Sequence, residues 1–164
     1  WQQSRDREAE DREAEDAARA AAAAEPLTVL SYNVWFEYPE TFALRMARLV
    51  QLADTSAPRP AALALQELTP SNLSLLRPGL LAAGYRPPFE QPANQRSFNG
   101  QEAYFAALTT RAPLGPLVAP RFVPYASSMM SRGLLFGRAE WPGVGSLLLS
   151  STHLESFVGP EKNQ

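Results

Sequence analysis

The feature that most constrains this chain is the distribution of its prolines. All fifteen prolines of the 164-residue sequence lie at Pro26 or beyond it. Proline fixes φ and has no backbone N–H donor, so each one tends to end or interrupt a regular element. The sequence beyond residue 25 therefore predicts many short elements joined by fixed turns, and it argues against a helical bundle.

The first 25 residues have a different composition. The motif Asp-Arg-Glu-Ala-Glu occurs at 6–10 and again at 11–15, and an alanine run follows through Ala24. These residues are strong helix formers, but they provide no apolar stripe that could be buried. We expect residues 1–25 to be a solvated helix or fraying tail that serves as a charged linker or leader. A partner-binding helix is the alternative.

Composition excludes several classes of function. The chain has no cysteine, which rules out disulfides, cysteine–zinc sites and thiol nucleophiles. No apolar run approaches the ~20 residues that a membrane span requires, and the acidic N-terminus is unlike a secretory signal. The net charge of −2 predicts no general attraction for nucleic acid, so phosphate binding would need local arginines or a metal ion.

Hydrophobic patterning predicts an alternation of strands and helices, followed by a region dominated by strands. An N-cap and first-turn proline at Thr69-Pro70 mark the start of a helix that ends at Gly84, and Pro78-Gly79 could split that helix. This order is typical of a layered α+β sandwich. The expected strands are 27–34, 61–66, 103–110, 118–124, 132–138 and 146–151; the expected helices are 42–53 and 70–83; residues 87–101 are expected to form a surface loop.

Three predicted strands end in polar residues that could carry chemistry. Glu67 follows the buried run Leu63-Ala64-Leu65, Asn33 closes the first strand, and His153, the only histidine, follows Leu147-Leu148-Leu149. Ligand sites of open α/β sheets lie at the carboxyl ends of strands, and a carboxylate is a ligand that Mg²⁺ favours. Considered singly, these residues also fit a surface cap, an Asx turn and a structural histidine. No Gly-x-Ser-x-Gly motif supports a serine hydrolase.

Taken together, the motifs around these residues resemble a known family. Leu30-Ser31-Tyr32-Asn33-Val34-Trp35, Ala64-Leu65-Gln66-Glu67-Leu68 and Ser151-Thr152-His153-Leu154-Glu155-Ser156 are similar, in this order, to the opening motifs of the endonuclease/exonuclease/phosphatase superfamily. The stretches 102–108 and 124–132, together with the His-Leu-Glu-Ser run, resemble its tyrosyl-DNA phosphodiesterase 2 branch. The resemblance covers residues 27–164 and implies a partial four-layer α/β-sandwich of the DNase I-like type.

The resemblance also implies roles for individual residues. Glu67 would be the Mg²⁺ ligand, with Mn²⁺ as an alternative ion, Asn33 would orient phosphate and water, and His153 would contact the scissile phosphate. Arg132 would grip a backbone phosphate, although a strand-edge charge is the simpler interpretation of this residue. The remaining candidates for substrate contact are Tyr104, which also fits core packing, Glu155 and Ser156.

The family continues with Gly-Asp-x-Asn and Ser-Asp-His motifs that this sequence lacks. We therefore expect residues 27–164 to be the N-terminal half of the domain, inactive alone and of doubtful independent stability. The expected parent is a monomeric, metal-dependent phosphodiester hydrolase acting on DNA 5′ ends that carry a protein adduct, in nucleus or cytoplasm. The alternatives are another phosphodiesterase or nuclease of the superfamily, or a non-catalytic homologue used for binding.

Overall fold

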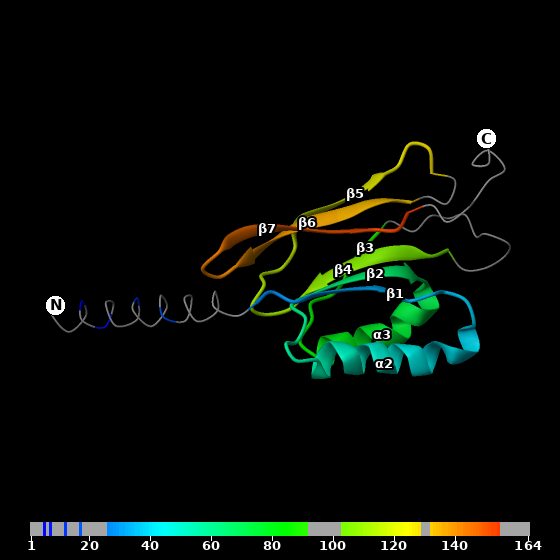
Figure 1. Ribbon diagram of the computed structural model, residues 1–164, viewed down its shortest axis with the longest axis horizontal. Coiled ribbons are helices and arrows are strands. Elements are labelled where there is room, and N and C mark those ends of the chain that lie inside the picture. The colour runs from blue at the N-terminus through cyan, green and yellow to red at the C-terminus, as the bar shows by residue number, and fades with distance from the viewer. Residues whose placement is uncertain are drawn as a thin grey trace.

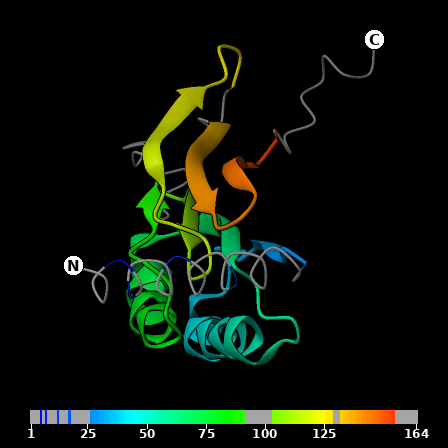
Figure 2. The ribbon, with the colours of Figure 1, turned by 90° about the vertical axis from the view of Figure 1, so that its left-hand side faces the viewer.

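The computed structural model describes residues 26–91, 103–128 and 132–154, together with Arg5, Arg7, Arg12 and Ala17, which are helical and exposed. The main part consists of two helices, a four-stranded sheet and a three-stranded sheet stacked in that order (Figures 1 and 2). Among these residues no helix is long and apolar enough to cross a membrane. This arrangement is a mixed α/β sandwich, as the sequence predicts.

The first sheet has the strand order β1-β2-β4-β3. Strand β1 (Val29–Asn33) runs parallel to β2 (Ala62–Leu68), because α2 (Phe42–Thr55) makes the crossover between them. Strand β4 (Phe105–Thr110) pairs antiparallel with β2, and the short β3 (Phe89–Glu90) pairs with β4. The carboxyl ends of β1 and β2 therefore lie beside the amino end of β4.

The second sheet is an antiparallel meander of β5 (Val118–Pro124), β6 (Gly133–Trp141) and β7 (Gly145–Thr152). It covers the face of the first sheet that the helices leave open (Figure 1). Strand β7 ends, and β6 begins, at the same edge of the sandwich where β1 and β2 end. The carboxyl ends of β1, β2, β5 and β7 and the amino ends of β4 and β6 thus lie at this edge.

Successive side chains of β2 point to opposite faces of the first sheet and so belong to two separate hydrophobic cores. Leu63 and Leu65 face α2 and the helix α3 (Pro70–Ala82), whereas Ala62 and Ala64 face the second sheet. The small alanines let the two sheets approach closely, with Leu135 of β6 filling the space between them. All five of these side chains are 4 % exposed or less, which explains why this segment is apolar on both faces.

The structure corrects several expected boundaries. Helix α3 is continuous through Pro78, so the predicted split is wrong. Gly79 lies where a Cβ atom would come within 2.6 Å of Val50 Cγ2, so its lack of a side chain lets α3 pack tightly on α2. A two-residue strand, β3, occupies part of the expected loop 87–101. The strand expected at 27–34 is reduced to Val29–Asn33, and a 3₁₀ turn, η1 (Pro39–Thr41), precedes α2.

Candidate functional site

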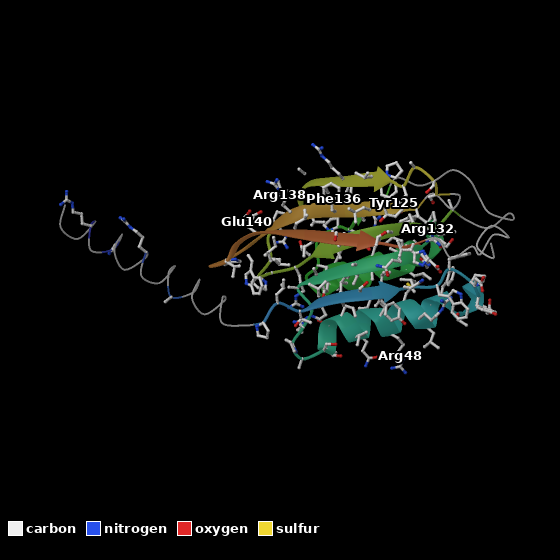
Figure 3. All side chains as sticks on the ribbon, turned by 45° about the horizontal axis from the view of Figure 1, so that its top comes forward. Arg48, Tyr125, Arg132, Phe136, Arg138 and Glu140 are labelled. Carbon is white, nitrogen blue, oxygen red and sulfur yellow. The ribbon has the colours of Figure 1, made fainter. Side chains whose placement is uncertain are left out.

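The site lies at the edge of the sandwich where β1, β2, β5 and β7 end and where β4 and β6 begin. Glu67, Tyr104, Arg132 and His153 line a small pocket at this edge, together with Gln91, Phe105, Ala106 and Gly133. Figure 3 shows Arg132 at this edge, whereas Glu140 lies at the opposite end of the sheet. The pocket thus brings together residues of both sheets, and Asn33, 120 positions before His153 in the sequence, lies in contact with that histidine.

Glu67 enters the pocket because β2 is irregular at this point. Regular alternation would turn Glu67 toward the helices, as Leu63 and Leu65 are turned. Instead, the pairing with β4 shifts between Leu65 and Leu68, and Glu67 has φ 58°. A left-handed conformation is unfavourable for a residue with a Cβ atom, typically by about 1–3 kcal/mol, and bulges that re-aim a side chain are common beside active sites. Both Gln66 and Glu67 consequently face the second sheet.

Asn33 forms the predicted Asx turn and also faces the site. Its Oδ1 accepts a hydrogen bond of 2.8 Å from the backbone N–H of Trp35, which fixes the orientation of the amide. The Nδ2 atom then lies 3.1 Å from Nε2 of His153. Asn33 can therefore both form an Asx turn and contribute to the site, because the turn directs its Nδ2 toward His153.

His153 lies between Asn33 and Glu67. Its Nε2 is 3.2 Å from Glu67 Oε1 as well as 3.1 Å from Asn33 Nδ2. The orientation of the Asn33 amide requires Nε2 to accept a hydrogen bond, whereas the carboxylate requires it to donate one. A ring nitrogen can do only one of these at a time, so the three side chains leave one of these two contacts unsatisfied.

Arg132 and Tyr104 form the opposite wall of the pocket. The guanidinium carbon of Arg132 lies 4.7 Å from the centroid of the Tyr104 ring, and Nη2 lies 4.0 Å from Glu67 Oε1. Arg132 is 5 % exposed, so the alternative interpretation, a charge at an exposed strand edge, does not hold. Tyr104 in turn stacks on Phe36, with centroids 4.7 Å apart and planes 12° from parallel. Cation–π contact and stacking fix the guanidinium, which can then present its fork to an anion.

Sequence reasoning missed Gln66 and Ser151. The buried Gln66 side chain donates to Ser151 Oγ at 2.9 Å and lies 3.1 Å from the carbonyl oxygen of Ala64. These contacts join the two sheets immediately beneath the site. A glutamine in an otherwise apolar strand was the available signal, because a buried amide requires partners.

The other predicted residues stand as follows. Glu155 and Ser156, like Met129 and Met130, lie outside the described residues. Within the described part of the chain, no group of three or more His, Asp or Glu side chains could hold a metal ion. Among the described residues that line the pocket, Glu67 is the one carboxylate. One carboxylate fits Mg²⁺, since this ion commonly uses one or two carboxylates together with waters and phosphate oxygens.

Neither a family model nor a curated protein matches the sequence. Solved structures do match: the chain shares its fold with part of TDP2, ANGEL2 and Nocturnin, which are proteins of the endonuclease/exonuclease/phosphatase superfamily with a DNase I-like fold. TDP2 from D. rerio, complexed with a single-strand DNA product, is 25 % identical with a TM-score of 0.65, over 83 % of this chain and 49 % of that one. The human Nocturnin catalytic domain, with bound sulfate, is 18 % identical with a TM-score of 0.63, over 84 % and 53 %.

ANGEL2, a 2′,3′-cyclic phosphatase, is also similar, at 15 % identity and a TM-score of 0.60, over 79 % of this chain and 41 % of that one. The chain thus spans about half the length of the solved structures it matches. At these identities the Nocturnin and ANGEL2 likenesses establish the fold alone.

Proposed function

We propose that the protein to which this chain belongs is a metal-dependent phosphodiester hydrolase that releases protein adducts from DNA 5′ ends. The observation that carries this proposal is that Glu67, Arg132 and His153 line one pocket beside the ring of Tyr104, with Asn33 Nδ2 3.1 Å from Nε2 of His153. A carboxylate for a metal and three nitrogen-bearing side chains for phosphate oxygens are the groups that phosphoryl transfer requires.

The competition of Asn33 and Glu67 for Nε2 of His153 supports the metal assignment. Glu67 would hold the cation, and its carboxylate would then no longer require a donor at Nε2 of His153, 3.2 Å away. Nε2 would then be free to accept from Asn33 Nδ2, whose orientation the Trp35 N–H already sets. Bound Mg²⁺, or Mn²⁺ in its place, would polarise the phosphoryl oxygen and offset charge developing in the transition state.

The protein's own groups would hold the phosphate. Asn33 Nδ2, which lies 3.1 Å from Nε2 of His153, and the guanidinium of Arg132, which lines the pocket, are the donors that the two sheets would contribute. The guanidinium carbon of Arg132 lies 4.7 Å from the centroid of the Tyr104 ring, so this contact would position the charge before substrate arrives. His153 would contact the scissile phosphate.

Support for DNA as substrate comes from the likeness to a TDP2 that was crystallised with a single-strand DNA product. The resemblance of the sequence motifs to the same branch supports a tyrosyl adduct on the DNA 5′ end as the group that is released. Two alternatives remain as candidates: a phosphatase or nuclease acting on another substrate, as the name of ANGEL2 indicates for that protein, and a non-catalytic homologue. Nuclear residence would follow from the DNA-repair role.

The test is hydrolysis by the complete protein of a 5′-tyrosyl oligonucleotide, a 2′,3′-cyclic nucleotide and a p-nitrophenyl phosphodiester, each with Mg²⁺, with Mn²⁺ and with EDTA. We expect metal-dependent release of tyrosine, and no turnover with EDTA. Preference for the cyclic nucleotide would transfer the assignment to a phosphatase. Inactivity on all three substrates would favour the non-catalytic homologue.

A further inference from the structure

A groove of about 470 Å³ lies next to the candidate site and has no role in the proposed chemistry. It is formed by residues 36–43, which lead from β1 into α2, and by the start of α3. We infer that it binds the polypeptide side of the substrate, as an extended segment carrying basic and apolar side chains. The inference rests on the proposed function, because such a segment would be the leaving side of the phosphodiester.

The segment that forms the groove is held in one shape. Arg45 of α2 donates hydrogen bonds to the carbonyl oxygens of Val34 (2.9 Å) and Tyr38 (3.1 Å), and also to those of Trp35 and Glu37. Trp35 and Tyr38 have φ of 60° and 59°, values that a residue with a side chain adopts only when its surroundings impose them. A surface fixed in this way loses little conformational entropy when a ligand binds.

The walls of the groove are apolar and aromatic. Phe36, Tyr38, Phe42 and Leu75 line it, and Tyr38 and Leu75 remain about half exposed, at 53 % and 49 %. The edge of Tyr38 is further fixed by a T-shaped contact with Trp35, with ring centroids 5.1 Å apart. Exposed aromatic side chains that are held rigid are typical of the surfaces that bind peptides.

The charges of the groove decide between a peptide and a nucleic acid strand. The charged residues that line it are Glu37 and Glu40, and within the described residues neither forms a salt bridge. The nearby cation, Arg45, is already bonded to backbone carbonyls. Two carboxylates repel a phosphate backbone and attract lysine or arginine side chains, so the groove favours a basic peptide.

The groove also adjoins the pocket that would hold the phosphate, as a binding site for the leaving group must. Phe36, which lines the groove, stacks on Tyr104, which lines the phosphate pocket, so the two rings form the wall between the groove and the pocket. A phosphodiester held by Arg132 and His153 could therefore direct its leaving group over the Tyr104–Phe36 stack into the groove. The same path would carry a polyanionic strand toward Glu37 and Glu40, which is unfavourable.

The experiment uses the complete protein and two fluorescein-labelled peptides that surround a tyrosine with leucines and either lysines or glutamates. We expect fluorescence anisotropy to show binding of the lysine peptide and at least about fivefold weaker binding of the glutamate peptide, the difference narrowing with added salt. Glu40→Lys should weaken lysine-peptide binding by about fivefold, whereas Glu140→Lys, an exposed charge reversal at the far end of β6, should not change it.

The binding measurement needs no turnover, so its result is separate from that of the hydrolysis test. Equal affinity for the two peptides, or no effect of Glu40→Lys beyond that of Glu140→Lys, would overturn the peptide groove even if the protein releases tyrosine from DNA. Tighter binding of a single-stranded oligonucleotide by Glu40→Lys, with unchanged peptide binding, would overturn it in favour of a nucleic acid strand.

Discussion

At the scale of single residues, the site depends on one unusual backbone conformation. Glu67 has a positive φ, so two consecutive side chains of β2 turn to the same sheet: Gln66 toward Ser151 and Glu67 toward His153. Gln66 forms a hydrogen bond between the two sheets, and Glu67 lines the pocket. The strain at Glu67 is therefore associated with the position of the carboxylate on which the proposed chemistry depends.

Glu67→Ala should reduce metal-dependent turnover of the complete protein by at least about 100-fold, because several kcal/mol of transition-state stabilisation would be lost with the metal. Glu67→Gln, which retains the shape of the side chain, should be similarly impaired. Steady-state kinetics across a Mg²⁺ titration measures the effect, with Glu140→Ala as the matched control. Full activity in either Glu67 variant would contradict the metal assignment.

Gln66→Ala should lower the free energy of unfolding by about 1–3 kcal/mol, because the buried Ser151 hydroxyl would lose its partner. Denaturant unfolding of the single variants and of Gln66→Ala/Ser151→Ala measures the coupling between the two side chains. We expect the double variant to be less destabilised than the sum of the two single variants. Strict additivity would mean that the contact between the sheets contributes nothing.

At the scale of elements, the connection between β1 and α2 is held by a side chain rather than by regular backbone pairing. The Arg45 guanidinium donates to four backbone carbonyl groups of this connection, and its Nε also donates to Thr41 Oγ1 at 2.9 Å. The connection begins at Asn33, so its shape and the orientation of the Asn33 amide are linked through Trp35. The contacts that order this connection therefore also help to orient the Asn33 side chain in the site.

Arg45→Lys should keep the charge but lose the planar fork that reaches several carbonyl groups at once. We expect faster backbone hydrogen exchange across residues 34–38, with little change in the strands of the two sheets, as measured by exchange and mass spectrometry of the complete protein. Arg48→Lys, on the exposed face of the same helix, is the matched control (Figure 3). Unchanged exchange in Arg45→Lys would show that the connection is ordered by other contacts.

At the scale of the whole molecule, the end of the sandwich opposite the site is fastened by Tyr85. Its hydroxyl donates to the carbonyl oxygen of Pro60 at 2.6 Å and lies 3.3 Å from that of Ala53, and Arg111 lies against its ring. Tyr85 is 3 % exposed. Burial raises the pKa of Tyr85 above its usual value near 10, against a smaller opposing effect of Arg111 that lowers it.

This raised pKa predicts how stability depends on pH. The folded protein resists ionisation of Tyr85, so its contribution to stability is complete below about pH 10 and is lost as pH rises through the folded pKa. Tyr85→Phe should cost about 1 kcal/mol at neutral pH and should reduce the loss of stability above pH 10. Unfolding free energies of the two proteins between pH 7 and pH 11 check this, and parallel curves would contradict it.

The order and type of the two helices and six longer strands among the described residues could be predicted from the sequence, because proline spacing, apolar runs and the Thr69 cap act through local geometry. The short β3 and the 3₁₀ turn η1 were not predicted. The sequence also determined which polar residues close strands, so Asn33, Glu67 and His153 could be proposed as a set. Their roles and the identity of the metal remain predictions. The continuity of α3 through Pro78 was not foreseeable, since it depends on Gly79 packing against Val50 of a different helix.

Only the tertiary structure decided how the site is built. Pairing of β2 with β4 imposes the bulge that turns Glu67 into the pocket, and no local propensity predicts a positive φ for glutamate. The burial of Arg132 against Tyr104, and the link from Gln66 to Ser151, require two sheets that are distant in the sequence to meet. Sequence patterns record local preferences of the backbone, whereas these contacts exist only once the sheets have packed.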